Sequence, residues 1–295
     1  MHIGSTLILD TFAEAFRMRF ARLLVTATNE YWLDIALQEF TGYGTSVIGC
    51  DAEIGVEQKL DASATPDGRP GAAVLLFGFS SEALSEAVPN RVGQCLMTCP
   101  TTSVYNGLPA ADESLSLGKH LRYFGDGFQK SKLIDGRRFW RIPVMDGEFI
   151  VEQQVGISKG VAGGNIILQA TSQEIALAAA KQVSDSLATL PGIITPFPGG
   201  VVRSGSKVGS LYKGLVASTN DAFCPTLQGR VESQLVDGVN CCYEIVFDGI
   251  DMPSVSNATR VAMQSAAGDG VLAIGAGNYG GKLGKFFFQL RDLVE

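Results

Sequence analysis

The sequence predicts an α+β fold in which a βαββαβ unit occurs twice in tandem, with a β-rich arm between the copies. Three observations support this class. Apolar strand patterns alternate with capped helix patterns in the first half, aromatic and charged residues alternate over 116–158, and the second half repeats the order of the first. Ala27-Thr28 aligns with Ala170-Thr171, and Arg91-Val92 aligns with Arg260-Val261, as an internal duplication would produce.

The duplication divides the chain into two predicted lobes. Residues 1–147 form an N-terminal lobe with the hairpin arm, and residues 148–295 form a C-terminal lobe that carries most of the functional site. A chain of 295 residues is long enough for two lobes that each bury a core. The free faces or edges of two such sheets can meet and leave a cleft, which glycine-rich loops would line.

The first lobe is expected to contain six regular elements. They are, in chain order, a strand over 20–26, a helix from Glu30 to a stop at Gly42, strands over 45–48 and 74–79, a helix over 82–91 and a short strand around 94–98. Thr28 or Asn29 supplies the side-chain oxygen that caps the first helix, and Ser80-Ser81 caps the second.

The arm over 116–158 is predicted to consist of β-hairpins. Asp-Gly pairs at 135–136 and 146–147 favour two-residue hairpin turns because both residues tolerate positive φ. Asp126-Gly127 predicts a third turn of that kind.

The second lobe repeats the pattern of the first. Its expected elements are a strand over 165–170, a helix that begins at the capping box 171–174 and ends at Pro191-Gly192, a strand over 242–248, a helix over 254–267 and a strand over 271–275. Each of these strands and helices has a counterpart in the first half.

The segment 195–226 is rich in Gly, Ser and Pro and cannot form a core. Around Lys207 it offers Ser hydroxyls, an ammonium group and backbone N–H groups that glycine lets approach a ligand. This is the chemistry that holds an anion or a polar carbonyl. A mobile surface loop is the alternative, and composition alone favours the two equally.

Charge and composition exclude several classes of protein. A net charge of −7 and a pI near 5.0 argue against nucleic acid as a partner, because binding a phosphate backbone requires a basic surface. Six cysteines without a Cys-x-x-Cys pair predict reduced, mostly buried thiols, and with two histidines they predict no metal site. The first residues lack a signal pattern and no apolar run could span a bilayer, so we expect a cytoplasmic protein with no membrane partner.

Ten short blocks along the chain resemble one enzyme family. They are DTFAEAF (10–16), TGYGTSV (41–47), TPDGRPG (65–71), GQC (93–95), FGDG (124–127), GVAGGN (160–165), PFPGG (196–200), SKVGS (206–210), ASTNDAFCPT (217–226) and GNYGGKLG (277–284). Together they resemble the formylmethanofuran:tetrahydromethanopterin formyltransferases.

The resemblance implies ferredoxin-like lobes, a homo-oligomer that is commonly a tetramer, and direct formyl transfer through a tetrahedral intermediate. Tetrahydromethanopterin and methanofuran would be coenzyme substrates, with no tightly bound cofactor. The reaction would serve one-carbon metabolism, in formaldehyde oxidation or in methanogenesis. The alternative is a non-catalytic assembly subunit of a larger formyltransferase/hydrolase complex.

Glu244 is the candidate catalytic residue. It lies in an otherwise apolar strand, where a carboxylate is costly unless it is partnered or protonated, and partial desolvation raises its pKa. Alternation puts Cys242, Glu244 and Val246 on one face and Tyr243, Ile245 and Phe247 on the other, so Glu244 looks into a cleft if the second face is core. Composition alone favours a solvent-facing glutamate, but the catalytic glutamate of the resembled family falls on this position.

The loops supply the candidate substrate-binding residues. These are Gly163, Gly164, Asn165, Phe197, Gly199, Gly200, Ser206, Lys207, Ser210, Ser218, Thr219, Asn220, Asp221, Asn278, Tyr279 and Lys282. Hydroxyl and ammonium groups would hold the carboxylates or phosphates of the coenzymes, and amide and carboxylate groups would form hydrogen bonds with the edge of the pterin ring. Glycines would let the backbone approach a ligand closely, and aromatic rings would stack on the furan or pterin ring. Surface loops, turns and core packing are the competing explanations. Neither a phosphate-binding loop nor a dinucleotide fingerprint is present, so ATP and NAD are not implied.

Overall fold

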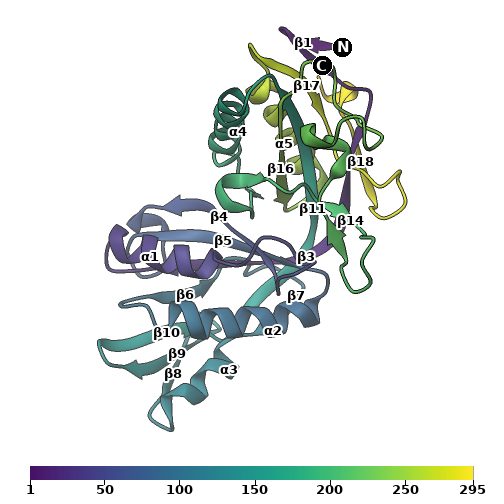
Figure 1. The fold of residues 1–295 in the computed structure, drawn as a ribbon. Helices are drawn as coiled ribbons and strands as arrows, with labels where there is room; N and C mark the ends of the chain where they lie inside the picture. The colour runs from purple at the N-terminus through teal and green to yellow at the C-terminus, as the bar shows by residue number, and fades with distance from the viewer. Residues whose placement is uncertain (295) are drawn as a thin grey trace. The chain divides into compact units, whose positions relative to one another are not determined.

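The protein is a mixed α/β structure with a large sheet and few helices, seen in a computed structural model that describes residues 1–294 (Figure 1). The mixed class agrees with the prediction from sequence. The chain forms two compact units: an internal unit, Met18–Lys159, and a terminal unit, Met1–Arg17 with Gly160–Glu295, which holds both ends of the chain. The predicted division into lobes at 147/148 stays a prediction.

The internal unit is a sheet with two main helices. Its strands pair in the order β4, β5, β3, β6, β10, β9, β8, and β7 pairs with the start of β11. The bounds are β3 (Phe12–Thr26), β4 (Glu53–Leu60), β5 (Gly71–Gly78), β6 (Ser103–Asn106), β7 (Glu113–Ser116), β8 (Lys130–Ile134), β9 (Arg137–Val144), β10 (Gly147–Glu152), β11 (Gln154–Ala170), α1 (Glu30–Thr41), α2 (Ser81–Arg91) and the single turn α3 (Gly118–Leu121). Strands β3 and β11 contribute residues to both units.

Both predicted helix caps of the internal unit are confirmed. Asn29 accepts a hydrogen bond from the backbone N–H of Trp32, and Ser80 accepts one from Ala83, so each helix begins where a side-chain oxygen satisfies a free N–H. The buried faces of both helices pack against apolar residues of β3 and β5 in one core. This packing fixes both helices on the sheet.

Two predicted strands of the internal unit are wrong. Residues 45–48 form a turn held by Ser46, whose carbonyl accepts from Gly49 and Cys50, and the strand β4 comes later. Residues 94–98 were expected as a strand, but the helix continues past Arg91 as a π-helical turn, η2 (Val92–Leu96). The reason is helical spacing: buried Val92 and Leu96 extend the apolar face of α2 into the same core.

The predicted hairpins of the arm are confirmed. Asp135 and Gly136 have φ values of 49° and 76° between β8 and β9, and positive φ at both positions matches the twist of a two-residue hairpin. A second hairpin joins β9 and β10, but its turn residues are Met145 and Asp146, one position before the predicted pair, and Gly147 is the first residue of β10. Asp126 also has positive φ, but there it ends the 3-10 helix η3 (Arg122–Gly125) instead of joining two strands.

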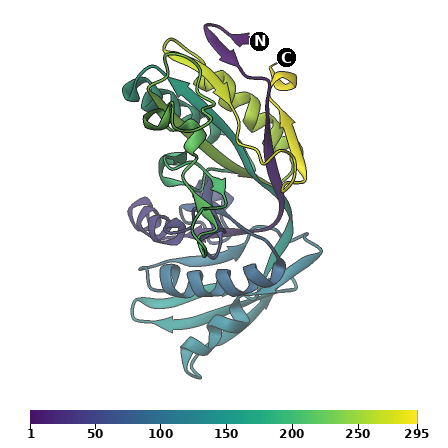
Figure 2. The ribbon, with the colours of Figure 1, turned by 45° about the vertical axis from the view of Figure 1, so that its right-hand side comes forward.

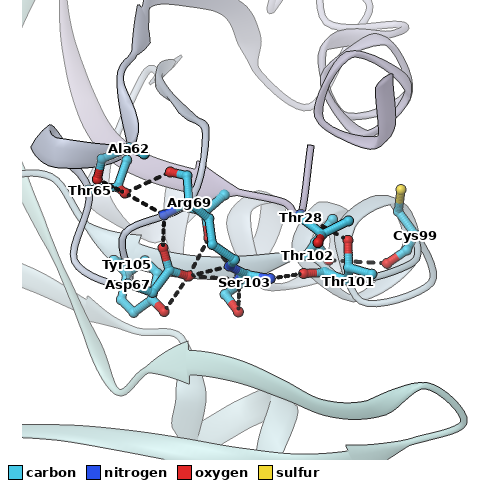
Figure 3. A network of polar contacts seen from close by, with 11 residues as sticks. Thr28, Ala62, Thr65, Asp67, Arg69, Cys99, Thr101, Thr102, Ser103 and Tyr105 are labelled. Atoms are coloured by element: carbon cyan, nitrogen blue, oxygen red, sulfur yellow. Dashed lines mark hydrogen bonds and ion pairs between the residues drawn. The ribbon is translucent and has the colours of Figure 1, made fainter. Parts of the chain in front are cut away.

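A polar network around Asp67 and Arg69 ties together three segments of the internal unit (Figure 3). Asp67 accepts from Thr26, Arg69 and Tyr105, while Arg69 also donates to the Thr101 carbonyl at 2.5 Å. Burial would raise the pKa of Asp67, but the bonds from Arg69 and Thr26 outweigh it and lower that pKa. The TPDGRPG motif therefore closes the loop between β4 and β5 onto the sheet.

The terminal unit contains the remaining strands, together with the first residues of β3 and most of β11. Its strands pair as β1, β2, β17, β11, β16, with β12 and β13 beyond β16, while β18 pairs with the first residues of β3. The bounds are β1 (His2–Ile3), β2 (Thr6–Ile8), β12 (Ile193–Ile194), β13 (Val201–Val202), β14 (Lys207–Val208), β15 (Ala217–Ser218), β16 (Cys241–Gly249), β17 (Val271–Gly275), β18 (Phe286–Gln289), α4 (Gln173–Leu187) and α5 (Met252–Ala266). Strand β1 and the short 3-10 helix over 291–293 lie near each other in this unit (Figure 2).

The helices α4 and α5 cover one face of this sheet. Their apolar side chains form a single core with Ile166, Ile245 and Phe247. Ser172 accepts from the Ile175 N–H and begins α4, so the cap is the second residue of the predicted box. The strand predicted at 271–275 is confirmed by β17. The opposite face of the sheet is therefore left for the loops of the terminal unit.

Candidate active site

Glu244 lies on the sheet face opposite the helices of the terminal unit. Strand register places it beside Ile167 of β11, while its neighbours Tyr243 and Ile245 point into the helix-covered core. The predicted division of this strand into two faces is thus observed. Glu244 is only 3% exposed, so the solvent-facing alternative is wrong.

The two carboxyl oxygens of Glu244 have different surroundings. Oε1 accepts a hydrogen bond of 2.6 Å from the Ser206 hydroxyl. Oε2 is buried and has no hydrogen-bond partner among residues 1–294. A buried acceptor without a partner is rare in folded proteins and marks a group that is ready to donate or accept when a ligand arrives.

Burial raises the pKa of Glu244 to about 7, against the lowering effect of the Ser206 hydroxyl and backbone N–H. The cause is the cost of a charge in a low-dielectric environment. A carboxyl group with this pKa exists in both protonation states near neutral pH. It can therefore act as an acid or a base there.

A cavity of about 40 Å³ adjoins Glu244. Its lining includes Ile167, Arg203, Gly205, Asn220 and Cys242, all from the terminal unit. This volume is close to the ~30 Å³ that one water molecule occupies in the liquid. Segment 195–226 thus packs over the carboxyl group and shares a cavity with it.

The strands of the hairpin β14–β15 carry two of the predicted binding residues, Lys207 and Ser218, and two more, Thr219 and Asp221, follow the hairpin. Lys207 Nζ lies 2.5 Å from Asp221 Oδ1, and this bond lowers the pKa of Asp221. Lys207 therefore already has an anionic partner within the protein. Ser218 pairs with Lys207 in the strand ladder, and Thr219 Oγ1 donates to the Ser204 carbonyl.

Ser206 is held from two directions. Its hydroxyl donates to Glu244, and its carbonyl accepts a 2.6 Å bond from the Tyr279 hydroxyl. Burial and the nearby Glu244 raise the pKa of Tyr279, so the phenol stays a donor. The Tyr279 ring also lies 6.0 Å from the ring of Phe16. Ser206 and Tyr279, both predicted as binding residues, are thus brought together at Glu244.

The glycine loop 277–284 is organised by Glu14, a residue that sequence reasoning missed. Its carboxylate is 1% exposed and accepts from the backbone N–H groups of Tyr279, Gly281, Leu283 and Gly284. Lys282 of this loop was predicted to hold an anionic group of a coenzyme, and the backbone N–H groups of the loop hold an anion that belongs to the protein. A glutamate within the apolar run FAEAF was the available signal.

Asn165 fixes the start of the same loop. Its side-chain oxygen accepts from the Gly277 N–H at 2.6 Å, and its amide donates to the Gly277 carbonyl at 3.2 Å. A Cβ at Gly277 would lie 3.3 Å from both Glu244 Oε1 and Asn165 Oδ1, so a side chain here would crowd both oxygens. Asn165 therefore holds the backbone of Gly277 in place beside Glu244.

Several predicted binding residues have explanations within the fold. A Cβ on Gly164 would meet Phe247 and Val255, so this glycine is required for helix packing. A Cβ on Gly200 would meet Ser184, whose hydroxyl donates to the Gly199 carbonyl. Ser210 accepts from the Tyr212 N–H and Asn278 donates to Thr11 Oγ1. Gly163 donates its N–H to Asp248, Phe197 begins a 3-10 helix and is half-buried, and Lys282 is exposed.

Comparison with known families covers both halves of the chain. The model of the formylmethanofuran-tetrahydromethanopterin formyltransferase family matches residues 1–144, and the model of its proximal lobe matches residues 147–293. The chain belongs to this family.

Other members of the formyltransferase family match over the full chain. The formylmethanofuran–tetrahydromethanopterin formyltransferase of Methylococcus capsulatus is 50% identical and that of Archaeoglobus fulgidus 47% identical, each over at least 99% of both chains. The solved formyltransferase of Methanosarcina barkeri has a TM-score of 0.94 at 45% identity, covering 99% of this chain and 100% of its own. A chain of the formyltransferase/hydrolase complex from Methylorubrum extorquens with methylofuran has a TM-score of 0.96 at 44% identity, covering 100% and 99%.

The described residues offer neither a metal site nor a membrane-spanning helix. Among residues 1–294, no three His, Cys, Asp or Glu side chains are grouped as a metal site requires. Across the same residues, no helix has the length and hydropathy to cross a bilayer. All six cysteines are free thiols of intermediate exposure, whereas mostly buried thiols were expected. Cys224 and Cys242 line the cavity beside Glu244.

Proposed function

We propose that this chain transfers a formyl group between the amine of methanofuran and N5 of tetrahydromethanopterin, with Glu244 as the catalytic acid. Membership of the formyltransferase family over the whole chain supports the reaction. The single observation that carries the assignment of Glu244 is its buried carboxyl group with one oxygen bonded to Ser206 and the other without a partner.

The reaction requires an amine to attack an amide carbonyl. A new C–N bond forms, the carbonyl oxygen becomes an oxyanion, and the tetrahedral intermediate collapses when the old C–N bond breaks. The attacking nitrogen loses a proton and the leaving nitrogen gains one, so the exchange needs no net proton. Both coenzymes serve as substrates, and no covalent enzyme intermediate is needed.

Protonated Glu244 suits the oxyanion step. Because Ser206 donates to Oε1, the proton is favoured on Oε2, which is the oxygen without a partner. An Oε2–H group can donate a hydrogen bond to the developing oxyanion and can give its proton to the leaving nitrogen as the old C–N bond breaks. Ionised Glu244 can accept the proton that the attacking amine releases.

The substrate-binding residues also remain a proposal. The candidates around Glu244 are Ser206, Asn220 and Tyr279, because they contact it, line its cavity or hold its partner. Lys282 is exposed and can hold a coenzyme carboxylate or phosphate. The remaining candidates are Gly163, Gly164, Asn165, Phe197, Gly199, Gly200, Lys207, Ser210, Ser218, Thr219, Asp221 and Asn278.

We further propose that the two halves of the chain are ferredoxin-like lobes produced by duplication. The strand order β6, β3, β5, β4 in the internal unit corresponds to the order β17, β11, β16, β12 in the terminal unit. In each unit a helix follows, of these four strands, the one that comes first along the chain and the one that comes third. That correspondence supports the duplication. The boundary at 147/148 lies close to the junction between the two family models.

The proposed setting is a cytoplasmic homo-oligomer, with a tetramer as the expected state. Association with other subunits of a formyltransferase/hydrolase complex is a second proposal. It is favoured by the Methylorubrum extorquens relative, which occurs in such a complex. Catalysis by the chain and assembly into a complex are compatible.

A transfer assay tests the proposed reaction. The purified chain is incubated with formylmethanofuran and tetrahydromethanopterin, and the formylated pterin is measured by its absorbance. We expect formation of N5-formyl-tetrahydromethanopterin, and the reverse reaction from that product with methanofuran. Absence of transfer in both directions, with a folded protein, would contradict the proposal.

A further inference from the structure

The carboxylate of Glu14 occupies a nest of backbone N–H groups in the loop 277–284. Two N–H groups, of Tyr279 and Gly281, donate to Oε2 at 2.7 and 2.9 Å, and two, of Leu283 and Gly284, donate to Oε1 at 2.7 and 2.5 Å. Gly280 and Gly281 have φ values of 66° and 72°, and this turn directs the N–H groups of Tyr279 and Gly281 toward the same carboxylate oxygen. Four bonds satisfy both oxygens of the carboxylate.

These bonds keep Glu14 ionised inside the protein. Burial alone would raise the pKa of Glu14, but the N–H groups of Gly284, Tyr279, Leu283 and Gly281 outweigh burial and lower it. The four N–H groups therefore favour the charged form of the side chain. A neutral amide in its place has only one acceptor oxygen, and its NH₂ group would face two N–H donors of the loop.

The loop that Glu14 holds reaches Glu244 through Tyr279. The Tyr279 backbone N–H binds Glu14, and its side-chain hydroxyl donates to the Ser206 carbonyl at 2.6 Å. Ser206 in turn donates its hydroxyl to Glu244 Oε1 at 2.6 Å. Each step is a short bond between buried or half-buried groups, and no step passes through solvent.

We infer that Glu14 is a positioning residue for formyl transfer: by fixing the loop 277–284 it holds Tyr279 on the Ser206 carbonyl, and thereby keeps the Ser206 hydroxyl on Glu244. This inference rests on the proposed role of Glu244. Glu14 acts through other groups and need not touch either coenzyme.

Three variants test the inference: Glu14→Gln, Tyr279→Phe and the double variant. We expect each single change to lower kcat about tenfold, because each loosens one link to Ser206. The double variant is expected to be no slower than the worse single variant, since both changes break the same chain of contacts. Independent, multiplicative losses would overturn the inference.

The pH profile separates positioning from a merely structural role. The bonds from Ser206 lower the pKa of Glu244, so loosening them moves the alkaline limb of the kcat profile to higher pH. The other titratable groups that line the cavity or contact Ser206 are Arg203, Cys224, Cys242, Tyr243 and Tyr279. We expect the same upward shift in Glu14→Gln and Tyr279→Phe. A lower rate with an unshifted limb in both variants would contradict the inference.

Glu152→Gln is the matched control. Glu152 is a buried carboxylate of the internal unit that accepts from Arg137 and from the Asn106 N–H. Its neutralisation is expected to lower stability without moving the limb. If Glu14→Gln does not fold, Tyr279→Phe alone still decides the outcome by its pH profile. Full activity of Glu244→Gln would refute the proposed function, whereas an inactive Glu244→Gln with unshifted Glu14 and Tyr279 variants would refute only this inference.

Discussion

Replacing Glu244 by Gln is expected to lower kcat by about 10²–10⁴-fold, with little change in KM for either coenzyme. Gln has the same shape, but it can neither protonate the developing oxyanion nor accept a proton from the attacking amine. Ser206 can still donate to the amide oxygen, so the surrounding contacts are retained. The measurement is steady-state formyl transfer with saturating concentrations of each coenzyme in turn.

The control for this variant is Glu174→Gln, which changes an exposed carboxylate in the first turn of α4. It should keep the rate of the unmodified protein. A Glu244→Gln enzyme within a factor of a few of that rate would remove the catalytic assignment.

Stability provides an internal check on the same variant. The pKa of Glu244 in the folded protein, about 7, is above the ordinary value of 4.5. Glu244 therefore contributes fully to the stability of the fold below the pKa that it has in the unfolded chain, and this contribution is lost as the pH rises through 7. Above that pH a buried charge costs the wild type about 3 kcal/mol. Glu244→Gln avoids this cost. We therefore expect the inactive variant to unfold at a higher temperature than the wild type at about pH 9.

Ser206→Ala is expected to have the second-largest effect, a loss of about tenfold to a hundredfold in kcat. Without the hydroxyl, the proton of Glu244 is no longer directed to Oε2, and the carboxylate loses a bond that lowers its pKa. The alkaline limb of the kcat profile should therefore move to higher pH. The acidic side, where Glu244 is protonated in both enzymes, should show only the lower rate.

Ser186→Ala controls for the loss of a serine hydroxyl. Ser186 lies in α4, and its hydroxyl bonds to the Gln182 carbonyl on the helix-covered side of the sheet. Its profile should overlay that of the wild type. A Ser206→Ala profile that keeps the wild-type limb would show that the Ser206 bond does not set the acidity of Glu244.

The regular elements with strong local signals could be predicted from the sequence. Asn29 and Ser80 cap the helices that they were expected to cap, and the Asp-Gly turn at 135–136 forms the expected hairpin. These features depend on bonds between residues that are three or four positions apart, and the local sequence therefore contains the cause.

Of the two missed elements, one depended on a local turn and the other on distant contacts. Residues 45–48 have strand-like composition but turn through the Ser46 carbonyl, and 94–98 continue a helix because Leu96 has a place in the core. Propensity is a weak guide wherever tertiary packing decides between two conformations.

The candidate site shows the same limit. Glu244 was noticeable as an acid in an apolar strand, but composition alone favoured a solvent-facing side chain, and the resemblance to the family favoured the catalytic role. The partners of charged groups could not be predicted. Glu14 and Gly284 are 270 residues apart, and Lys207 meets Asp221 across a hairpin, so two apparent ligand-binding features are paired within the protein. Only the folded chain brings these groups together.

Titration of the Glu244 carboxyl group tests the central claim most directly. In protein labelled with ¹³C at the glutamate carboxyl carbon, the signal absent from Glu244→Gln belongs to Glu244, and its shift is followed against pH. The account predicts a midpoint near 7. A midpoint near the ordinary 4.5 would contradict it, because Glu244 would then be ionised throughout the range in which an acid is needed.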